Sequence, residues 1–345
     1  MDFLSELCTM RAVSGYEYRI SNKICDLFRP YCDAVFCDTL GNVIAVKRAK
    51  KANAKSVMIE AHQDEIGLMV SKIDESGLLH FVTVGGIDAR ILPGAEVVVH
   101  AKKDYLGVIG AKPPHLQDSQ DADKCTKIKD MTIDIGLDEK TAKEQVSVGD
   151  TVTFAGGMKE LLSDNVASKS LDDRASVYAI LQVFIDLAKT DLSVDLYGVC
   201  AVCEEVGGRG AKTAGFGINP DIAIAIDVTH GITPDNSDNA FEMGSGVAIS
   251  KGPNIHPALC DKLIERAKMN NIEHTVEIEG GDTGTDAWLL QVAGEGIPTA
   301  LLSIPLRYMH TTVEVVSKKD INATVELAKA FVRDDCNNAE DWLCI

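Results

Sequence analysis

The chain has 345 residues, of which 46% are hydrophobic, so it is long enough for one large domain or two domains with full cores. Its 34 Lys and Arg residues against 52 Asp and Glu residues give a formal net charge of −18. This charge disfavours nucleic acid and anionic membrane surfaces as partners. No run of 18 or more apolar residues and no basic segment before an apolar core occurs, so we expect a cytoplasmic protein that does not enter membranes.

The ten cysteines are scattered from Cys8 to Cys344, and without an export signal we expect reduced thiols in the core. Cys200 and Cys203 have the spacing of some zinc and redox sites. On a strand, however, residues i and i+3 point to opposite faces, so the pair is not expected to converge on one metal. We interpret both as core residues.

The N-terminal part predicts two short amphipathic helices between residues 3 and 28, because apolar residues recur there at helical spacing. The segment Val35 to Val46 has Gly41-Asn42 at its centre and predicts a hairpin. A strand over residues 56–61 then runs directly into His62. It is the first strand end with a metal-binding type of side chain.

From about residue 69 to residue 160, short segments rich in Val, Ile and Leu alternate with Gly and Pro, which is typical of an all-β domain. The polar segment 116–129 within it predicts a surface loop. We therefore predict a barrel-like β domain over 69–160. It is inserted into an α/β domain formed by residues 1–68 and 161–345, with a mixed sheet covered by helices.

The second half returns to α/β patterning. A helix is expected from about Arg174 to Leu187, and a strand over 194–199 leads towards Glu204 and Glu205. The remaining expected elements are a Gly-rich turn after Glu205, a buried strand over 222–226 that ends in Asp227, a helix over 257–269, a strand over 299–304 closed by Pro305 and soon followed by His310, a helix over 318–332, and a mobile acidic tail over 334–341.

Four predicted strands thus end in, or soon lead to, a residue suited to holding a metal: His62, Glu205, Asp227 and His310. Open α/β sheets place their ligands in the crevice beyond the carboxyl ends of the strands. These four side chains are therefore expected to converge, although the chain separates them widely.

The adjacent acids Glu204 and Glu205 would repel each other unless a positive charge lay nearby, and a dinuclear metal centre supplies that charge. Two divalent ions about 3.5–4 Å apart need a bridging carboxylate and about two further ligands each. We assign Asp172 as the bridge, His62 and Asp227 to one metal, and Glu205 and His310 to the other.

Two residues are assigned catalytic roles beside the metals. Asp64 lies two positions from His62, so on an extended backbone its carboxylate accepts the imidazole N–H and orients the ring. Glu204 points away from Glu205 if the backbone is extended there. It is then free to take a proton from a water molecule activated by the metals.

Taken one at a time, these residues also have plain structural interpretations. His62 would be a hydrogen-bonded core histidine, Asp227 the end of a strand, and Asp172 the N-cap of the following helix. Glu204 and Glu205 would belong to a solvated loop. The metal centre accounts for all five residues together.

Five separated strings resemble the tetrahedral (TET) aminopeptidases, a family of dinuclear metallopeptidases with glutamyl, leucyl and deblocking members that are sometimes labelled endoglucanases. The resemblance runs over nearly the full length, in matching order. The strings are Ala61-His62-Gln63-Asp64-Glu65-Ile66-Gly67, Leu171-Asp172-Asp173-Arg174, Glu204-Glu205-Val206-Gly207-x-Arg209-Gly210-Ala211, Asp227-Val228-Thr229-His230 and Pro305-Leu306-Arg307-Tyr308-Met309-His310-Thr311.

The resemblance implies the same five metal ligands, with Glu204 as general base. It implies zinc or cobalt, removal of N-terminal residues from short peptides, and a β domain used for dimerisation, with dimers often assembled into a dodecamer. Gly280 to Ala287 resembles the loop that lines the family's cleft. Gln63, Cys203 and Gly208 depart from the family pattern, which bears on substrate preference.

Two other functions fit the residues less well. A glycoside hydrolase needs two carboxylates that face each other about 5–9 Å apart across the scissile bond, whereas Glu204 and Glu205 are adjacent. That mechanism also leaves the histidines without roles. A phosphate-binding loop before Lys212 would need glycine where Val206 and Ala211 stand. A purely structural role is an alternative for the β domain alone.

Overall fold

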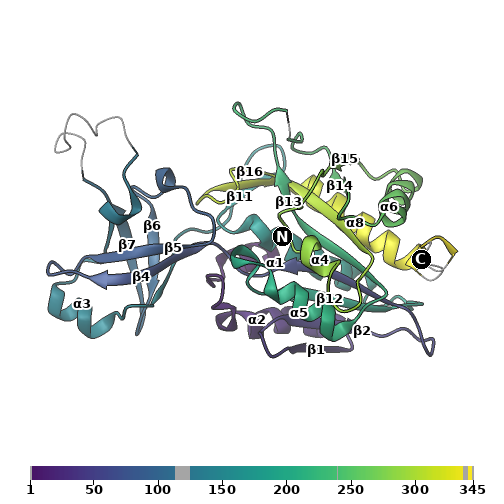
Figure 1. The fold of residues 1–345 in the computed structure, drawn as a ribbon, viewed down its shortest axis with the longest axis horizontal. Coiled ribbons are helices and arrows are strands. Elements are labelled where there is room, and N and C mark those ends of the chain that lie inside the picture. The colour runs from purple at the N-terminus through teal and green to yellow at the C-terminus, as the bar shows by residue number, and fades with distance from the viewer. Residues whose placement is uncertain (1, 113–124, 239, 337–340, 344–345) are drawn as a thin grey trace.

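The computed structural model describes residues 2–112, 125–238, 240–336 and 341–343, which form two lobes (Figure 1). One lobe is a mixed β-sheet with helices packed on it. The other is a closed barrel of six antiparallel strands. The predicted fold class, an α/β sheet with an inserted all-β barrel, is confirmed.

The sheet is parallel at its centre and antiparallel towards the two ends of its main strand order, and a further parallel pair of strands branches from it. Its strands are β1 (Ala34–Cys37), β2 (Val43–Lys47), β3 (Ser56–His62), β10 (Lys159–Glu160), β11 (Asn165–Ser168), β12 (Asp195–Ala201), β13 (Ile222–His230), β14 (Val247–Lys251), β15 (His274–Ile278), β16 (Thr299–Arg307) and β17 (Glu314–Ser317). Within the described chain their order is β1-β2-β12-β3-β13-β16-β17-β11-β10, and β14 joins β16 to β15. The central strands are almost wholly buried because helices cover both faces.

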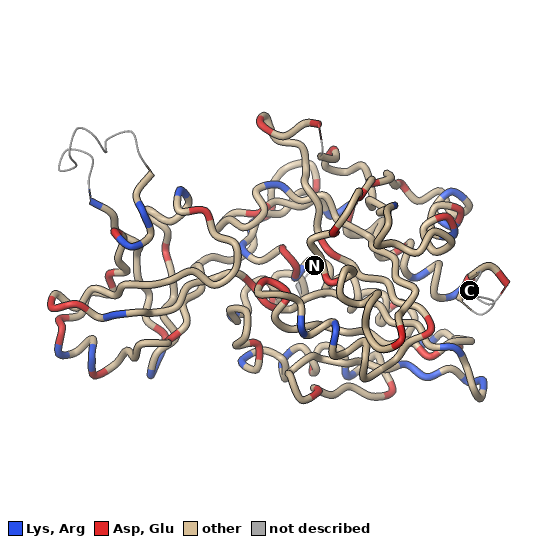
Figure 2. The backbone as a smooth tube through the Cα atoms, viewed as in Figure 1, with Lys and Arg blue, Asp and Glu red and all other residues tan. Residues whose placement is uncertain are grey.

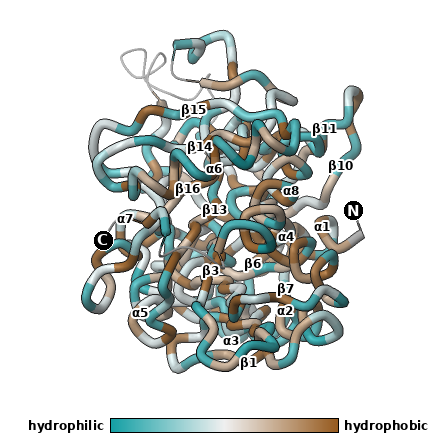
Figure 3. Tube along the Cα trace, turned by 90° about the vertical axis from the view of Figure 1, so that its right-hand side faces the viewer, coloured by the Kyte–Doolittle hydropathy of each residue, from teal (hydrophilic) through white to brown (hydrophobic). Residues whose placement is uncertain are grey.

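Helix α4 (Leu171–Leu187) packs on one face of the sheet, where Gly198 leaves room for Phe184. A Cβ at Gly198 would lie 2.5 Å from Phe184 Cε2. Phe28 of helix α2 (Ser21–Phe28) contacts Phe184 edge to face, with ring centroids 5.6 Å apart. Hydrophobic segments gather around α4 and β3 (Figure 3). The helices are α1 (Asp2–Thr9), α2 (Ser21–Phe28), α3 (Glu139–Gln145), α4 (Leu171–Leu187), α5 (Arg209–Ile218), α6 (Pro257–Met269), α7 (Ala287–Leu290) and α8 (Lys318–Asp334).

The barrel has its own core, built from inward-facing residues of alternating strand positions such as Leu68, Val70, Val97 and Val99. Acidic and basic residues are spread over both lobes rather than gathered on one (Figure 2). The barrel strands are β4 (Gly67–Ile73), β5 (Leu79–Val84), β6 (Glu96–His100), β7 (Asp104–Gly110), β8 (Thr132–Asp134) and β9 (Thr151–Phe154). Because β4 begins soon after β3 ends, the barrel is attached beside His62.

Two strands run further than predicted. Strand β13 continues through Asp227 to His230, and β16 continues through Pro305 to Arg307. Along one side of β16, strand β14 pairs only with Leu302 and Ser303, and strand β17 pairs only with Leu306 and Arg307. Pro305 therefore lies between these partners, where its missing N–H costs no ladder hydrogen bond.

The predicted Gly-rich turn is present but short, with Gly207 and Gly208 at positive φ, and it is followed by a helix that the sequence did not predict, α5 over residues 209–218. Its glycines permit close packing: a Cβ at Gly210 would lie 2.2 Å from the carbonyl oxygen of Val202. Helix α3 was also missed within the all-β stretch, although Asp138 caps it by accepting a hydrogen bond from the backbone N of Thr141.

The acidic tail is not mobile throughout. Asp334 ends α8, and the buried carboxylate of Asp335 accepts a hydrogen bond from Arg266 Nε at 2.7 Å. Residues 337–340 of the predicted tail, and most of the predicted loop over 116–129, lie outside the described residues.

The nine described cysteines are free thiols, and six of them, including Cys200 and Cys203, are buried as expected. The exceptions are Cys32, which is partly exposed, and Cys37 and Cys125, which are exposed. None of the described helices is long and apolar enough to cross a membrane.

Candidate metal centre

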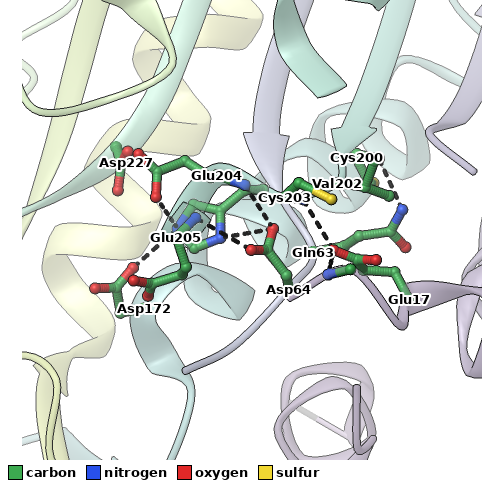
Figure 4. A network of polar contacts seen from close by, with 12 residues as sticks. Glu17, Gln63, Asp64, Asp172, Cys200, Val202, Cys203, Glu204, Glu205 and Asp227 are labelled. Atoms are coloured by element: carbon green, nitrogen blue, oxygen red, sulfur yellow. Dashed lines mark hydrogen bonds and ion pairs between the residues drawn. The ribbon is translucent and has the colours of Figure 1, made fainter. Parts of the chain in front are cut away.

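The structure brings together the residues that the sequence singled out, at one edge of the sheet (Figure 4). His62 is the last residue of β3 and stands in register with Ala201, the last residue of the parallel neighbour β12. Glu204 and Glu205 follow β12, and Asp227 projects from β13. Carboxyl ends of parallel strands meet at the same edge, so side chains distant in sequence become neighbours.

Asp172 stands between the two histidines. Its Oδ1 lies 3.0 Å from His62 Nε2, and its Oδ2 lies 3.3 Å from His310 Nε2. His310 Nε2 is also 3.4 Å from Glu205 Oε2. Asp172 caps nothing, since its carboxylate is turned to the two imidazoles, and the N-cap interpretation of this residue is wrong.

Two groups of side chains in the described chain have donor atoms within 4.8 Å of one another. Asp173, which received no role from the sequence, belongs to the second group. Both of its carboxylate oxygens are buried without a hydrogen-bond partner. Non-helical dihedrals at Asp172 and Asp173 turn both neighbouring acids into the cluster, which a helical pattern does not reveal. The groups are His62 with Asp172 and Glu205, and His62 with Asp173 and Asp227.

The two glutamates lie on a 3-10 turn over residues 204–206, not on an extended backbone, so the predicted geometry of this segment is wrong. The turn begins at Cys203, which has a left-handed φ of 62°. The backbone nitrogens of Glu204 and Glu205 donate to the two carboxylate oxygens of Asp64 at 3.1 and 3.2 Å. Asp64 therefore holds the turn that presents both acids.

Asp64 also faces His62: its Oδ1 lies 3.5 Å from His62 Nδ1, which has no hydrogen-bond partner among the described residues. Glu204 Oε2 approaches the other nitrogen of this ring, Nε2, at 3.9 Å. Glu204 is thus placed at the edge of the cluster.

The cluster carries more acid than its histidines neutralise. Burial raises the pKa of Glu204 to about 7. Burial and the charge of Asp172 raise the pKa of Glu205 well above its usual value, and burial does the same for Asp227. For Asp172, hydrogen bonds from His310 and His62 outweigh burial and hold the pKa well below its usual range. A cation among these oxygens would relieve the repulsion, so the donor set fits divalent metals.

A cavity of about 770 Å³ opens onto the cluster. Thr283, Gly284 and Thr285 line it, so the cleft-lining position predicted for the segment Gly280 to Ala287 is confirmed. The lining also includes three further acids, Asp238, Glu277 and Glu279, and no Lys or Arg among the described residues.

The three departures from the family pattern have structural roles. Gln63 is fully buried and donates to the carbonyl oxygens of Gly41 and Cys200. Cys203 begins the 3-10 turn, and its backbone N donates to Glu17 Oε1 at 2.9 Å. A Cβ at Gly208 would lie 2.6 Å from Asp286 Oδ1, so this position has no room for a side chain.

Known proteins resemble this chain over most of its length. A sequence model of the family described as M42 glutamyl aminopeptidase matches residues 41–327. A lysyl aminopeptidase of Pyrococcus furiosus is 36% identical over 96% of each chain. Among solved structures, an aminopeptidase of Desulfurococcus kamchatkensis has a TM-score of 0.91 at 33% identity, covering 99% of this chain and 96% of its own. The TET1 peptidase of Pyrococcus horikoshii has a TM-score of 0.85 at 32% identity, covering 96% and 99%.

The fold and these matches define the class of the protein, a hydrolase that acts on peptide bonds. More particularly, the chain belongs to the M42 glutamyl aminopeptidase family.

Proposed function

We propose that the protein is an aminopeptidase that uses two divalent metal ions per chain to remove N-terminal residues from short peptides. The observation that carries the proposal is the convergence of His62, Asp172 and His310 with buried acids at the mouth of one cleft. Histidine nitrogens and carboxylate oxygens are the donors of catalytic zinc sites and also suit cobalt.

The ligand assignment keeps Asp172 as the bridge, with His62 and Asp227 on one metal and Glu205 and His310 on the other. Asp173 is an additional donor near His62 and Asp227. When bound, such metals lower the pKa of water and polarise the peptide carbonyl.

Glu204 is proposed as the general base. Its carboxylate lies beside His62 without belonging to either donor group, and burial raises its pKa to about 7, near the pH at which it must both accept and release a proton. It takes a proton from the attacking water and passes it to the leaving amine. Asp64 acts through its neighbours, because it orients His62 and fixes the turn that carries Glu204.

Assembly is proposed to involve the barrel, as a dimer and, in a larger form, a dodecamer. The TET1 peptidase of Pyrococcus horikoshii can assemble into a tetrahedron or a large octahedral shell. Three apolar side chains on barrel strands β5 and β7 are exposed: Val82, Leu106 and Val108. A dimer interface over these side chains would remove their apolar surface from water.

The free N-terminus of the substrate gives the first test. Aminoacyl p-nitroanilides are expected to be hydrolysed, whereas their N-acetylated forms are not, because an exopeptidase recognises the amine. Equal cleavage of both forms would contradict the proposal. Release of reducing sugar from a soluble glucan, measured in parallel, would support the glycoside hydrolase instead.

The charge of the cleft gives the second test. Lysyl substrates are expected to have at least about tenfold higher kcat/KM than glutamyl substrates. Glu277 and Glu279 line the cleft, the described lining contains no Lys or Arg, and these two acids would repel an acidic side chain. Glu277 is held in place by the hydroxyl groups of Thr229 and Ser250. The name of the lysyl aminopeptidase relative agrees with this preference.

Glu277→Gln should reduce the preference for lysyl over methionyl substrates, whereas Glu273→Gln, an exposed position on the same segment, should not. A glutamyl preference in the unmodified protein would overturn the assignment of the cleft.

A further inference from the structure

We propose that the inserted barrel contributes to metal binding, because its Gly85-Gly86 loop positions the imidazole of His310. The inference rests on the proposed function, since it concerns His310 as a metal ligand. The family resemblance implied that the β domain serves dimerisation, and a purely structural role was the alternative. The structure places one of its loops against the cluster instead.

The contact is a hydrogen bond between side chain and backbone. His310 Nδ1 lies 2.9 Å from the carbonyl oxygen of Gly86. A carbonyl oxygen can only accept, so Nδ1 must carry the proton. In a neutral ring this leaves the lone pair on Nε2, the nitrogen that faces Asp172 and Glu205. Gly86 therefore selects the tautomer in which His310 can bind a metal.

The two histidines of the cluster differ in how they are held. The side chain of His62 is 2% exposed, lies at the end of a central strand, and has Asp64 beside its Nδ1. The side chain of His310 is 35% exposed and lies on the loop after β16, with a left-handed φ of 59°. Packing fixes His310 less, so its orientation depends more on the bond to Gly86.

The loop also leaves space that a side chain would fill. A Cβ at Gly86 would lie 3.0 Å from His310 Nδ1, and a Cβ at Gly85 would lie 3.3 Å from Glu205 Oε2. Both ligands assigned to the same metal thus pack against this loop. His62 and Asp227 are not among the nearest atoms that a Cβ at Gly85 or Gly86 would meet.

Strand pairing in the barrel fixes where the loop lies. Strands β4 and β5 pair with Gly67 opposite Val84, so the residue after Val84 returns beside Ile66. A Cβ at Gly85 would lie 2.8 Å from Ile66 Cγ2, which confirms how closely the two segments approach. A displaced barrel would therefore withdraw the Gly86 carbonyl from His310.

Gly86→Ala tests the proposal, with Gly110→Ala as the matched control. Gly110 lies in the same barrel, and its Cβ would meet only the carbonyl oxygen of Thr132, at 3.9 Å. Zinc binding to the metal-stripped protein is measured by calorimetry, and bound metal by mass spectrometry. Gly86→Ala should weaken one of two sites by about 10–100-fold, while Gly110→Ala binds as the unmodified protein does. Two unaltered sites in Gly86→Ala would overturn the inference.

The same change in a His310→Ala background separates positioning from a general structural effect. Without the imidazole, Gly86→Ala should cause no further loss of zinc affinity, because the two changes act through one contact. A further loss of the same size would mean that Gly86 acts elsewhere. If the unmodified protein bound no zinc, the proposed function itself would be contradicted, and the inference about Gly86 would fall with it.

A structure of the zinc-loaded protein tests the role of Gly86 even if Gly86→Ala does not fold, because it shows which nitrogen of His310 binds the metal. Zinc is expected on His310 Nε2, with Nδ1 still within hydrogen-bond distance of the Gly86 oxygen. Zinc bound through Nδ1 would overturn the proposal.

Discussion

Stripping the protein of divalent metal with a chelator is expected to abolish peptide hydrolysis, and adding zinc or cobalt is expected to restore it. The metals are assigned several kcal/mol of transition-state stabilisation, so the loss should be at least about 10³-fold. Without them, the acids around Asp172 face one another in a buried site, and Glu204 has no activated water to deprotonate. Elemental analysis should find about two metal ions per chain.

Metal affinity should also rise with pH. The hydrogen bond to Asp172 and the charge of Asp64 outweigh burial and raise the pKa of His62, and burial raises those of Glu205 and Asp227. Each of these groups must be deprotonated to bind a metal, so the raised pKa values mean that metal binding releases protons and is weakened as the pH falls. Calorimetry in buffers of different ionisation enthalpy counts the released protons. A fully active preparation that contains no metal would contradict both expectations.

The fold class follows from the sequence because it depends on patterns that repeat along the chain, and the family follows from five separated strings in matching order. Apolar runs such as Ile222 to Ile226 identify buried strands, and short segments punctuated by Gly and Pro identify the barrel. The convergence of His62, Asp227 and His310 also follows, since parallel strands bring their carboxyl ends to one edge. None of this requires knowledge of a single dihedral angle.

The local geometry could not be predicted in the same way. The turn at Glu204 and Glu205 depends on a left-handed residue at Cys203 and on hydrogen bonds to Asp64, which is distant in sequence. The contribution of Asp173 depends on non-helical dihedrals just before the predicted helix, which the sequence pattern does not specify. Gly86 carries no side chain, so a search for metal-binding residue types passes over it.

The turn changes the basis on which Glu204 is assigned its role. The sequence separated the two glutamates by the alternation of an extended strand, which the structure does not have. They are distinguished instead by their neighbours: Glu205 Oε2 lies 3.4 Å from His310 Nε2, whereas Glu204 Oε2 lies 3.9 Å from His62 Nε2 and belongs to neither donor group. The roles of Glu204 as base and Glu205 as ligand therefore rest on these contacts, and variants of the two residues should behave differently.

Glu204→Gln is expected to lower kcat by about 10²–10⁴-fold while both metals stay bound, because an amide of the same shape cannot take the proton from water. Glu205→Ala is expected to lose the metal assigned to His310 and Glu205, and activity with it. Steady-state kinetics and elemental analysis of the two variants, each purified in zinc, distinguish a base from a ligand. The KM of Glu204→Gln should change little, since the substrate is still bound by the cleft.

Equal metal loss in the two variants would show that Glu204 is a ligand as well, and the proton would then need another acceptor. Full metal content with undiminished kcat in Glu204→Gln would remove the general base from the mechanism. Glu279→Gln serves as the matched control, because it changes a carboxylate that lines the same cleft but belongs to neither donor group. It should keep both metals and most of kcat, so that a loss confined to Glu204→Gln reports the proton transfer and not the charge of the cleft.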